Sequence, residues 1–535
     1  MTSQPVASAP SAAPEPRTIL RPGAVITRPD WPAEAKIRSL HVVRIGGAGM
    51  SAVARLALEA GLTVSGSDSQ DGQFIAPLRA AGARIGIGFD AGLLAEDVDL
   101  LVVSTAVRAD NPEVIAARER GIPVIHRAAA LAGLLGGRSL IAVAGTHGKT
   151  STTGLAVMAL RGAGLDPAWA LGAAVPDLGR NAGFAAADPT DPLAAAPAEE
   201  SAVEGAADDS GVAPALPQAG GLAVVEADES DGSFLAFAPQ SLVVTNLEPD
   251  HLDFHGDAET LTAAFDALTA RLVPGGTLVV CADDAGAAAL GDRAAERGLP
   301  VIRYGVGAGA DWRVLEERGG ATGARVRLAT PHGPLDLSLA VAGHHNVLNA
   351  VGALVAVRAA VPEADPAALA GGLARFTGAS RRFDVAGEAG GVTVVDDYAH
   401  HPREVAATLS AARGIVEAQD RGGRVLVVFQ PHLYSRTRLF AEDFATALTA
   451  ADQAWVLPVY GAREDPDPQI TAATITAHAP LGVLPVADDA PEGELAAAVA
   501  STARPGDLVL MLGAGDIVEL TPSVLAALGG TGEGD

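Results

Sequence analysis

The 535-residue sequence contains one cysteine, Cys281, and only two lysines, Lys36 and Lys149. A single cysteine excludes an internal disulfide and suits a reducing compartment such as the cytoplasm. Because Cys281 ends the apolar run 278–281, we expect it in a buried strand and not as a nucleophile. The sequence also lacks any run of about 18 apolar residues, so we expect no membrane-spanning helix.

Basic residues are fewer than acidic ones. The sequence has 37 lysines and arginines against 64 aspartates and glutamates, which gives a net charge of -27. This charge opposes binding to nucleic acid or to an anionic membrane, and an anionic substrate would need local positive groups. Residues 1–36 are rich in alanine, proline and serine, and they lack the charged start and apolar core of a signal peptide. We expect them to form a disordered tail.

Short apolar stretches alternate with alanine- and leucine-rich segments from about residue 39 to the end. This alternation predicts an α/β protein with parallel sheets covered by helices, long enough for about two to four domains. We expect a Rossmann-like domain at 37–138, a central domain of P-loop ATPase type at 139–378 and a Rossmann-like C-terminal domain at 379–535. The alanine-, proline- and acid-rich segment 185–219 predicts a disordered insertion in the central domain.

The strongest functional signal is a glycine-rich turn between the apolar run 140–143 and a helix-favouring segment. When a strand, a glycine-rich turn and a helix follow one another, the backbone N–H groups of the turn and the helix N-terminus hold phosphate. A lysine in the turn reaches the outer phosphates, and a hydroxyl can hold magnesium. The standard pattern requires glycine at position 143, where this sequence has Val143, so the loop is a compact variant. The expected phosphate-binding residues are Gly145, Thr146, His147, Gly148, Lys149, Thr150 and Ser151.

Two groups of acidic residues follow two later strand-like runs. Residues 226–231 include four carboxylates, and residues 246–253, which follow the run 242–245, include Glu248, Asp250 and His251. Carboxylates this close together repel one another unless cations are bound between them. Their spacing therefore favours a magnesium site over the alternative of a solvated acidic loop. Because both groups follow strands, they are expected to converge with the phosphate loop at one edge of a sheet.

A second glycine-rich turn follows the apolar run 40–45 and precedes another helix-favouring segment, and Asp68 lies 19 residues after Gly49. This arrangement indicates a site for a diphosphate. The strict dinucleotide fingerprint would require glycine at position 44, which is Arg44, so a nicotinamide-cofactor site and a purely structural turn remain alternatives.

At least six segments between about residues 39 and 517 resemble, in order, the Mur ligase family of ATP-dependent amide-bond ligases in peptidoglycan synthesis. They include the turn 45–51, the loop 145–150, Ala-Asp-Glu-Ser-Asp-x-Ser-Phe at 227–234, Asn-x-Glu-Pro-Asp-His-Leu-Asp at 246–253, Gly-His-His-Asn at 343–346 and Phe-Gln-Pro-His-x-Tyr-Ser-Arg-Thr at 429–437. The acidic segments are most similar to members that join L-alanine to UDP-N-acetylmuramate. The resemblance therefore implies this reaction, through an acyl phosphate, with ADP and phosphate as products.

The resemblance also implies ATP, Mg²⁺ and a set of site residues. Thr150 and Glu229 would hold one magnesium ion and His251 a second, while Lys149 contacts the β- and γ-phosphates. The catalytic residues would be Lys149, Glu229, His251 and Arg382. For ATP, Asn346 and Asn349 would contact the adenine, Asp397 the ribose and Arg382 a phosphate. For Asn346, the alternative role of a helix cap remains open. The other substrates would meet Gly46, Gly47, Ala48, Gly49, Met50, Asp68, His401, His432 and Arg436.

Some features depart from the family pattern or leave alternatives. Arg44 stands where the family has a glycine, and Leu433 stands where many members have an arginine. The two histidines before Pro402 could also belong to a surface turn, and this alternative is left open. No lysine follows Lys149, which excludes the carbamylated lysine that bridges metals in several relatives. A nucleotide-dependent switch would explain only the phosphate loop, and an oxidoreductase only the first turn. The nearest rival is a related ligase that adds a whole peptide to the same UDP-sugar.

Overall fold

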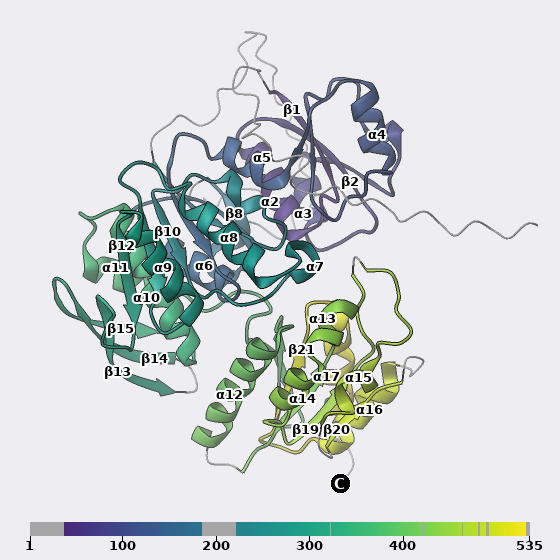
Figure 1. Ribbon diagram of the computed structural model, residues 1–535. Helices are drawn as coiled ribbons and strands as arrows, with labels where there is room; N and C mark the ends of the chain where they lie inside the picture. Colours follow the sequence, from purple (N-terminus) through teal and green to yellow (C-terminus); the bar gives the residue numbers. More distant parts are fainter. Residues whose placement is uncertain are drawn as a thin grey trace, which may run out of the picture.

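The computed structural model of the chain describes residues 37–184, 221–320, 323–419, 422–462, 464–479, 482–487 and 492–530. The expected tail at 1–36 and the expected insertion at 185–219 lie outside these residues. The described chain forms three sheets in succession, each with helices packed around it (Figure 1). None of its helices combines the length and the apolar character needed to span a membrane.

The first sheet is entirely parallel, with strand order β3-β2-β1-β4-β5. Alternate residues of its central strands contribute to two cores, one with α2 and α5 and the other with α4. This is the Rossmann-like arrangement expected from the sequence. Its strands are β1 (Ser39–Val43), β2 (Thr63–Asp68), β3 (Arg84–Ile87), β4 (Leu100–Val103) and β5 (Val124–His126). Its helices are α2 (Ala48–Glu59), α3 (Ile75–Ala80), α4 (Pro112–Glu119) and α5 (Arg127–Leu134), with a 3₁₀ turn η1 (Ala91–Leu93).

The second sheet has the order β15-β14-β13-β12-β11-β10-β6-β9-β7-β8. Its strands are β6 (Ser139–Ala144), β7 (Ala168–Val175), β8 (Arg180–Gly183), β9 (Leu222–Glu226), β10 (Ser241–Val244), β11 (Thr277–Cys281), β12 (Val301–Gly305), β13 (Trp312–Gly320), β14 (Gly323–Thr330) and β15 (Gly333–Leu339). Its helices are α6 (Lys149–Gly162), α7 (Leu252–His255), α8 (Ala258–Thr269), α9 (Ala285–Glu296), α10 (His344–Ala360) and α11 (Pro366–Leu373), with η2 (Pro176–Leu178) and η3 (Ser233–Ala236).

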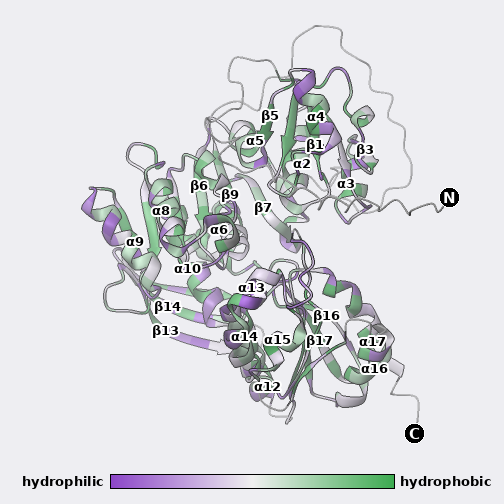
Figure 2. Cartoon of the chain, turned by 45° about the vertical axis from the view of Figure 1, so that its right-hand side comes forward, coloured by the Kyte–Doolittle hydropathy of each residue, from purple (hydrophilic) through white to green (hydrophobic). Residues whose placement is uncertain are grey.

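Both faces of the parallel centre of this second sheet are covered, as its apolar strands require (Figure 2). Ile141 and Val143 of β6 pack with α6, α10 and α11, whereas Leu140 and Ala142 face the core shared with α8 and α9. The latter core continues into α2 and α5, so the first two domains share one hydrophobic interior. Cys281 is buried at the end of β11, as expected.

The third sheet has the order β16-β17-β21-β18-β19-β20 and is also covered on both faces. Its strands are β16 (Asp384–Ala389), β17 (Val392–Asp397), β18 (Val425–Phe429), β19 (Gln453–Val456), β20 (Val483–Pro485) and β21 (Leu508–Leu512). Its helices are α12 (Pro402–Gln419), α13 (Tyr434–Leu439), α14 (Ala441–Leu448), α15 (Ala472–Thr476), α16 (Glu492–Thr502) and α17 (Thr521–Gly530), with η4 (Asp516–Leu520).

The expectation of an α/β protein with three sheet domains is confirmed, but the second and third sheets are not wholly parallel. Strands β13, β14 and β15 form an antiparallel meander, and β8 and β16 pair antiparallel with β7 and β17. In the meander, apolar and polar residues alternate, as in β14, where Val326 and Leu328 are buried beside exposed Arg325 and Arg327. Such one-sided strands suit antiparallel edges, whereas the strands buried on both faces lie in the parallel centre.

The topology places three functional loops together. Strand β6 pairs with β9 on one side and with β10 on the other, all parallel. The phosphate loop and the two acidic segments therefore emerge at the same carboxyl edge. The expected convergence of these segments is confirmed.

Candidate active site

The phosphate loop connects β6 to α6 through two glycines with positive φ, 127° at Gly145 and 81° at Gly148. A Cβ at Gly148 would collide with the amide of Asn349, and one at Gly145 would collide with Thr245. Glycine is therefore required at both positions by backbone conformation and by space. No side chain caps α6, so its first N–H groups are open to a ligand.

Lys149 lies between this loop and the first acidic segment. Its Nζ donates to the carbonyls of Gly145 and Thr146 at 2.7 and 3.0 Å and to Glu229 Oε1 at 2.9 Å. Burial by itself would lower the pKa of Lys149, but the carboxylates of Glu229 and Asp228 outweigh it and raise the pKa. The ammonium is thus held charged where terminal phosphates of a nucleotide would lie.

Glu229 is fully buried, so a solvated acidic loop is the wrong description of this segment. Burial raises its pKa to about 8, with a further contribution from Asp228, and Lys149 opposes the shift. Its Oε1 is 3.7 Å from His251 Nε2. Within the described part of the chain, Glu229 Oε2 and His251 Nδ1 are buried without a hydrogen-bond partner. Carboxylate oxygen is the donor that Mg²⁺ prefers, so Glu229 fits a divalent cation.

A cavity of about 280 Å³ lies between the central and C-terminal domains. The phosphate loop, the start of α10 and the start of α12 line it. The sequence-predicted residues among its walls are His147, Gly148, Thr150, Ser151, Asn346, Asn349, Arg382 and Asp397.

The hydrogen bonds of these wall residues are largely local. Asn346 donates to the Ala342 carbonyl at 2.8 Å, which ties it to the helix start as well as to the cavity. Asp397 accepts from the N–H groups of Phe383 and Ala399 at 2.7 and 2.8 Å. Burial raises the pKa of Asp397. Arg382 lies over the Tyr398 ring, 5.0 Å from its centroid.

The C-terminal domain reaches the acidic segment through Arg436. Its Nη2 donates to Asp250 Oδ1 at 2.6 Å, and both side chains are only 4% exposed. His432 Nδ1 lies 3.4 Å from Arg436 Nη1, and the His400 ring packs edge-on against His432. Leu433, which replaces a family arginine, is buried, so its side chain packs inside and supplies no charge to the cavity.

The glycine turn of the first domain is not among the walls of this cavity. Gly46 N donates to Asp68 Oδ2 at 2.8 Å, so the predicted turn and the predicted acid are in contact. A Cβ at Gly49 would collide with the guanidinium of Arg127, which pairs with Asp228 of the central domain. Arg127 thus joins this turn to the acidic segment beside Glu229.

Comparison with known proteins identifies the family. The domains described as "Mur ligase family, catalytic domain", "Mur ligase middle domain" and "Mur ligase, glutamate ligase domain" match residues 39–138, 143–357 and 381–515. A protein of Kineococcus radiotolerans named UDP-N-acetylmuramate–L-alanine ligase is 48% identical over 92% of this chain and 97% of its own. The chain belongs to the Mur ligase family. A Paenarthrobacter aurescens protein of the same name is 47% identical over 92% of this Mur ligase and 97% of its own length.

Solved structures agree with this assignment. The crystal structure of UDP-N-acetylmuramate-alanine ligase from Thermotoga maritima has a TM-score of 0.71 and 26% identity, and covers 92% of this Mur ligase and 99% of that chain. A murein peptide ligase from Psychrobacter arcticus has a TM-score of 0.66 at 23% identity, covers 92% and 99% of the two chains, and shows the shared fold.

Three charged residues of this Mur ligase site were missed by the sequence analysis. Glu404 lies 3.1 Å from His147 Nδ1 and accepts from the N–H groups of His400 and His401 at 3.0 and 3.3 Å. Arg403 forms an ion pair with Glu248, and Arg127 pairs with Asp228. A carboxylate near the start of a helix is a capping signal that points to Glu404. The two arginines carry no such local signal.

We expect this Mur ligase to lose stability in mild acid, because some of its histidines are buried. Burial lowers the pKa of His401 to about 4 and that of His400 to about 3, against about 6.5 when unfolded. The unfolded chain therefore binds more protons below pH about 6.5, and the unfolding free energy falls as pH drops toward 4. Thermal unfolding between pH 7.5 and 5 should show this slope. His400→Gln should flatten it, the exposed control His332→Gln should not, and equal slopes would contradict the assignment.

Proposed function

We propose that this Mur ligase joins L-alanine to the lactyl carboxylate of UDP-N-acetylmuramate and converts ATP to ADP and phosphate. The observation that carries the proposal is the position of Lys149, 2.9 Å from Glu229, at the edge of a cavity completed by Arg382 and Asp397 of the C-terminal domain. The names of relatives that are 44 to 48% identical support the choice of substrates. The peptide-adding alternative is not favoured, because these relatives carry the name of the L-alanine ligase.

Each domain has a proposed task, within the boundaries 37–138, 139–378 and 379–535. The turn Gly46–Met50 and Asp68 of the first domain bind the UDP-sugar. The central domain binds ATP through the loop 145–151, with the adenine near Asn346 and Asn349. The C-terminal domain supplies Arg382 to a phosphate and Asp397 to the ribose. We expect the protein to act in the cytoplasm, because nucleotide-activated precursors are available there.

Magnesium is proposed at the acidic edge, with Thr150 and Glu229 on one ion and His251 on a second. The buried, unpartnered Glu229 Oε2 supports this placement. When bound, Mg²⁺ neutralises negative charge on the phosphate oxygens. Lys149 adds a fixed ammonium, and a bridging carbamylated lysine has no candidate because Lys149 is the last lysine of the sequence.

The reaction requires activation because a carboxylate is a poor electrophile. The lactyl carboxylate oxygen attacks the γ-phosphorus of ATP and the bond to ADP breaks, which gives an acyl phosphate. The amine of L-alanine then attacks the acyl carbon, phosphate leaves and the amine loses a proton. Lys149 and Arg382 stabilise the negative charge that develops on the phosphoryl oxygens. Closure of the third domain excludes water, which would otherwise hydrolyse the acyl phosphate.

L-Alanine is proposed to bind near His401, His432 and Arg436, with Arg436 holding its carboxylate. Arg436→Lys keeps the charge but removes the planar fork, so we expect the KM for L-alanine to rise about 10- to 100-fold while the KM for ATP stays unchanged. Initial-rate assays with each substrate varied measure both constants. Arg438→Lys is the matched control, because Arg438 is 58% exposed and pairs with Asp467. A change in the ATP constant alone would argue against Arg436 as the amino-acid anchor.

The function is tested by mixing the pure protein with ATP, Mg²⁺, UDP-N-acetylmuramate and single amino acids or a tripeptide. Phosphate release and product mass are measured. The expected result is stoichiometric phosphate and UDP-N-acetylmuramoyl-L-alanine with L-alanine. Product formed only with the tripeptide would establish the alternative.

A further inference from the structure

A cluster of three metal-binding side chains lies at the junction of the central and C-terminal domains. His147 comes from the phosphate loop, Glu248 from the segment after β10, and His401 from the turn before α12. Each offers one ligand atom, and these atoms all lie within 4.8 Å of one another. The cluster is distinct from the residues proposed for magnesium, Thr150, Glu229 and His251.

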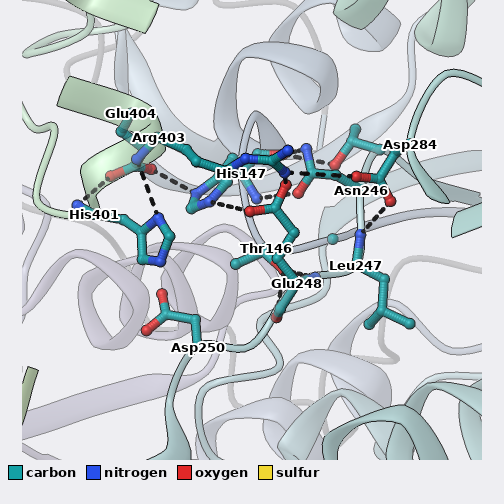
Figure 3. Close-up of polar contacts among 12 residues, drawn as sticks. Thr146, His147, Asn246, Leu247, Glu248, Asp250, Asp284, His401, Arg403 and Glu404 are labelled. Carbon is teal, nitrogen blue, oxygen red and sulfur yellow. Dashed lines mark hydrogen bonds and ion pairs between the residues drawn. The ribbon is translucent and has the colours of Figure 1, made fainter. Parts of the chain in front are cut away.

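The His147 ring is oriented as a metal ligand. Its Nδ1 lies 3.1 Å from Glu404 Oε1 and donates to that carboxylate in the neutral ring. The lone pair is then on Nε2, which is buried, has no hydrogen-bond partner among the described residues and lies 3.8 Å from Glu248 Oε2 (Figure 3). A carboxylate behind a ligating histidine is the usual outer-shell arrangement of zinc sites.

The other two members complete the donor set. Glu248 pairs through Oε1 with Arg403, which leaves Oε2 facing His147. His401 is only 4% exposed, its ring centroid is 4.8 Å from that of His147, and its Nε2 has no hydrogen-bond partner in the described chain. Two imidazoles and one carboxylate, with a further position open, are a ligand set typical of Zn²⁺, whereas Mg²⁺ prefers oxygen alone.

We propose that His147, Glu248 and His401 form a Zn²⁺ site that clamps the central domain to the C-terminal domain. Because His147 and Glu248 also line the nucleotide cavity, the bound ion holds the two domains together at the wall of this cavity and inhibits nucleotide exchange. The inhibitory effect rests on the proposed function, whereas metal binding does not. The sequence offers no competing thiol site, since its only cysteine, Cys281, is buried in β11.

The binding test uses Co²⁺ as a spectroscopic probe with the full-length protein, free of nucleotide and Mg²⁺. We expect one Co²⁺ per chain, visible absorption typical of four or five ligands, and displacement by one equivalent of Zn²⁺. Glu248→Gln and His401→Gln should each weaken binding at least about 100-fold, and Glu404→Gln about 10- to 100-fold. The exposed control His332→Gln should bind as the wild type does. Absence of the band in the wild type, or equal binding by the ligand variants, would overturn the site.

A second measurement needs no variant and so does not depend on mutant folding. X-ray absorption at the zinc edge of the protein loaded with one equivalent of Zn²⁺ reports the ligands of the bound ion. Two imidazole ligands, with oxygen in the remaining positions, are the expected result. A ligand shell with no imidazole, or with only one, would overturn the shared site, and this outcome is independent of whether the protein ligates L-alanine.

Discussion

Lys149→Met is expected to lower the rate of phosphate release about 10³-fold, with full substrate saturation. The ammonium is the cation that the fold holds between the phosphate loop and Glu229, with acceptor oxygens at 2.7 to 3.0 Å from its nitrogen. Loss of one preorganised positive group at a phosphoryl-transfer site costs a factor of this order. Methionine retains most of the volume, and the buried carboxyl of Glu229, with a pKa raised to about 8, can take up a proton when its partner is removed. The rate is measured with UDP-N-acetylmuramate, L-alanine, ATP and Mg²⁺.

The sequence provides a matched control for this variant. Lys36 is its only other lysine, and Lys36→Met changes the net charge in the same way. The control should keep the wild-type rate. Wild-type turnover by Lys149→Met would remove this lysine from the mechanism and with it the assignment of the phosphate loop.

Glu229→Gln is expected to lower turnover about 10²- to 10³-fold, and saturating Mg²⁺ should not restore it. The substitution keeps the shape of the side chain but removes the anionic oxygens, one of which is buried without a hydrogen-bond partner in the described chain. An amide is a poor magnesium ligand compared with a carboxylate, so the Mg²⁺ concentration needed for half-maximal activity should rise. Rates are measured as a function of Mg²⁺ at fixed ATP.

The control for Glu229 is its neighbour Glu226 at the end of β9, which accepts a hydrogen bond from Gly172 N at 2.9 Å. Glu226→Gln should leave the Mg²⁺ dependence unchanged. The double variant Lys149→Met/Glu229→Gln should lose much less than the product of the two single losses, because the two side chains act as one unit. Multiplicative losses would show that they act separately.

Much of the fold was predictable because its strands carry local signals. The runs 140–143, 242–245 and 425–429 appear as β6, β10 and β18, each apolar enough to be buried on both faces. The antiparallel meander β13–β15 was missed because strand direction is set by pairing partners, which no short stretch of sequence specifies.

The residues that make up the site were also predictable, because they lie in short sequence motifs. Gly145 and Gly148 adopt positive φ, and the expected meeting of the loop with the acidic segments follows from the pairing of β6 with β9 and β10. The specific roles proposed for Arg382, Asp397 and Arg436 stay predictions, and the kinetics of Arg436→Lys test the last of them.

By itself, the sequence determined the buried strands, the phosphate-binding turn and the scarcity of lysine that leaves Lys149 alone at the site, because these depend on adjacent residues and composition. Only the tertiary structure decided which charges meet across domains. His147 and Glu404 are 257 positions apart, Arg436 and Asp250 are 186 apart, and Arg127 and Asp228 are 101 apart. Ion pairing acts over a few ångströms of space, and the folded sheets, not proximity along the chain, bring these groups within that distance.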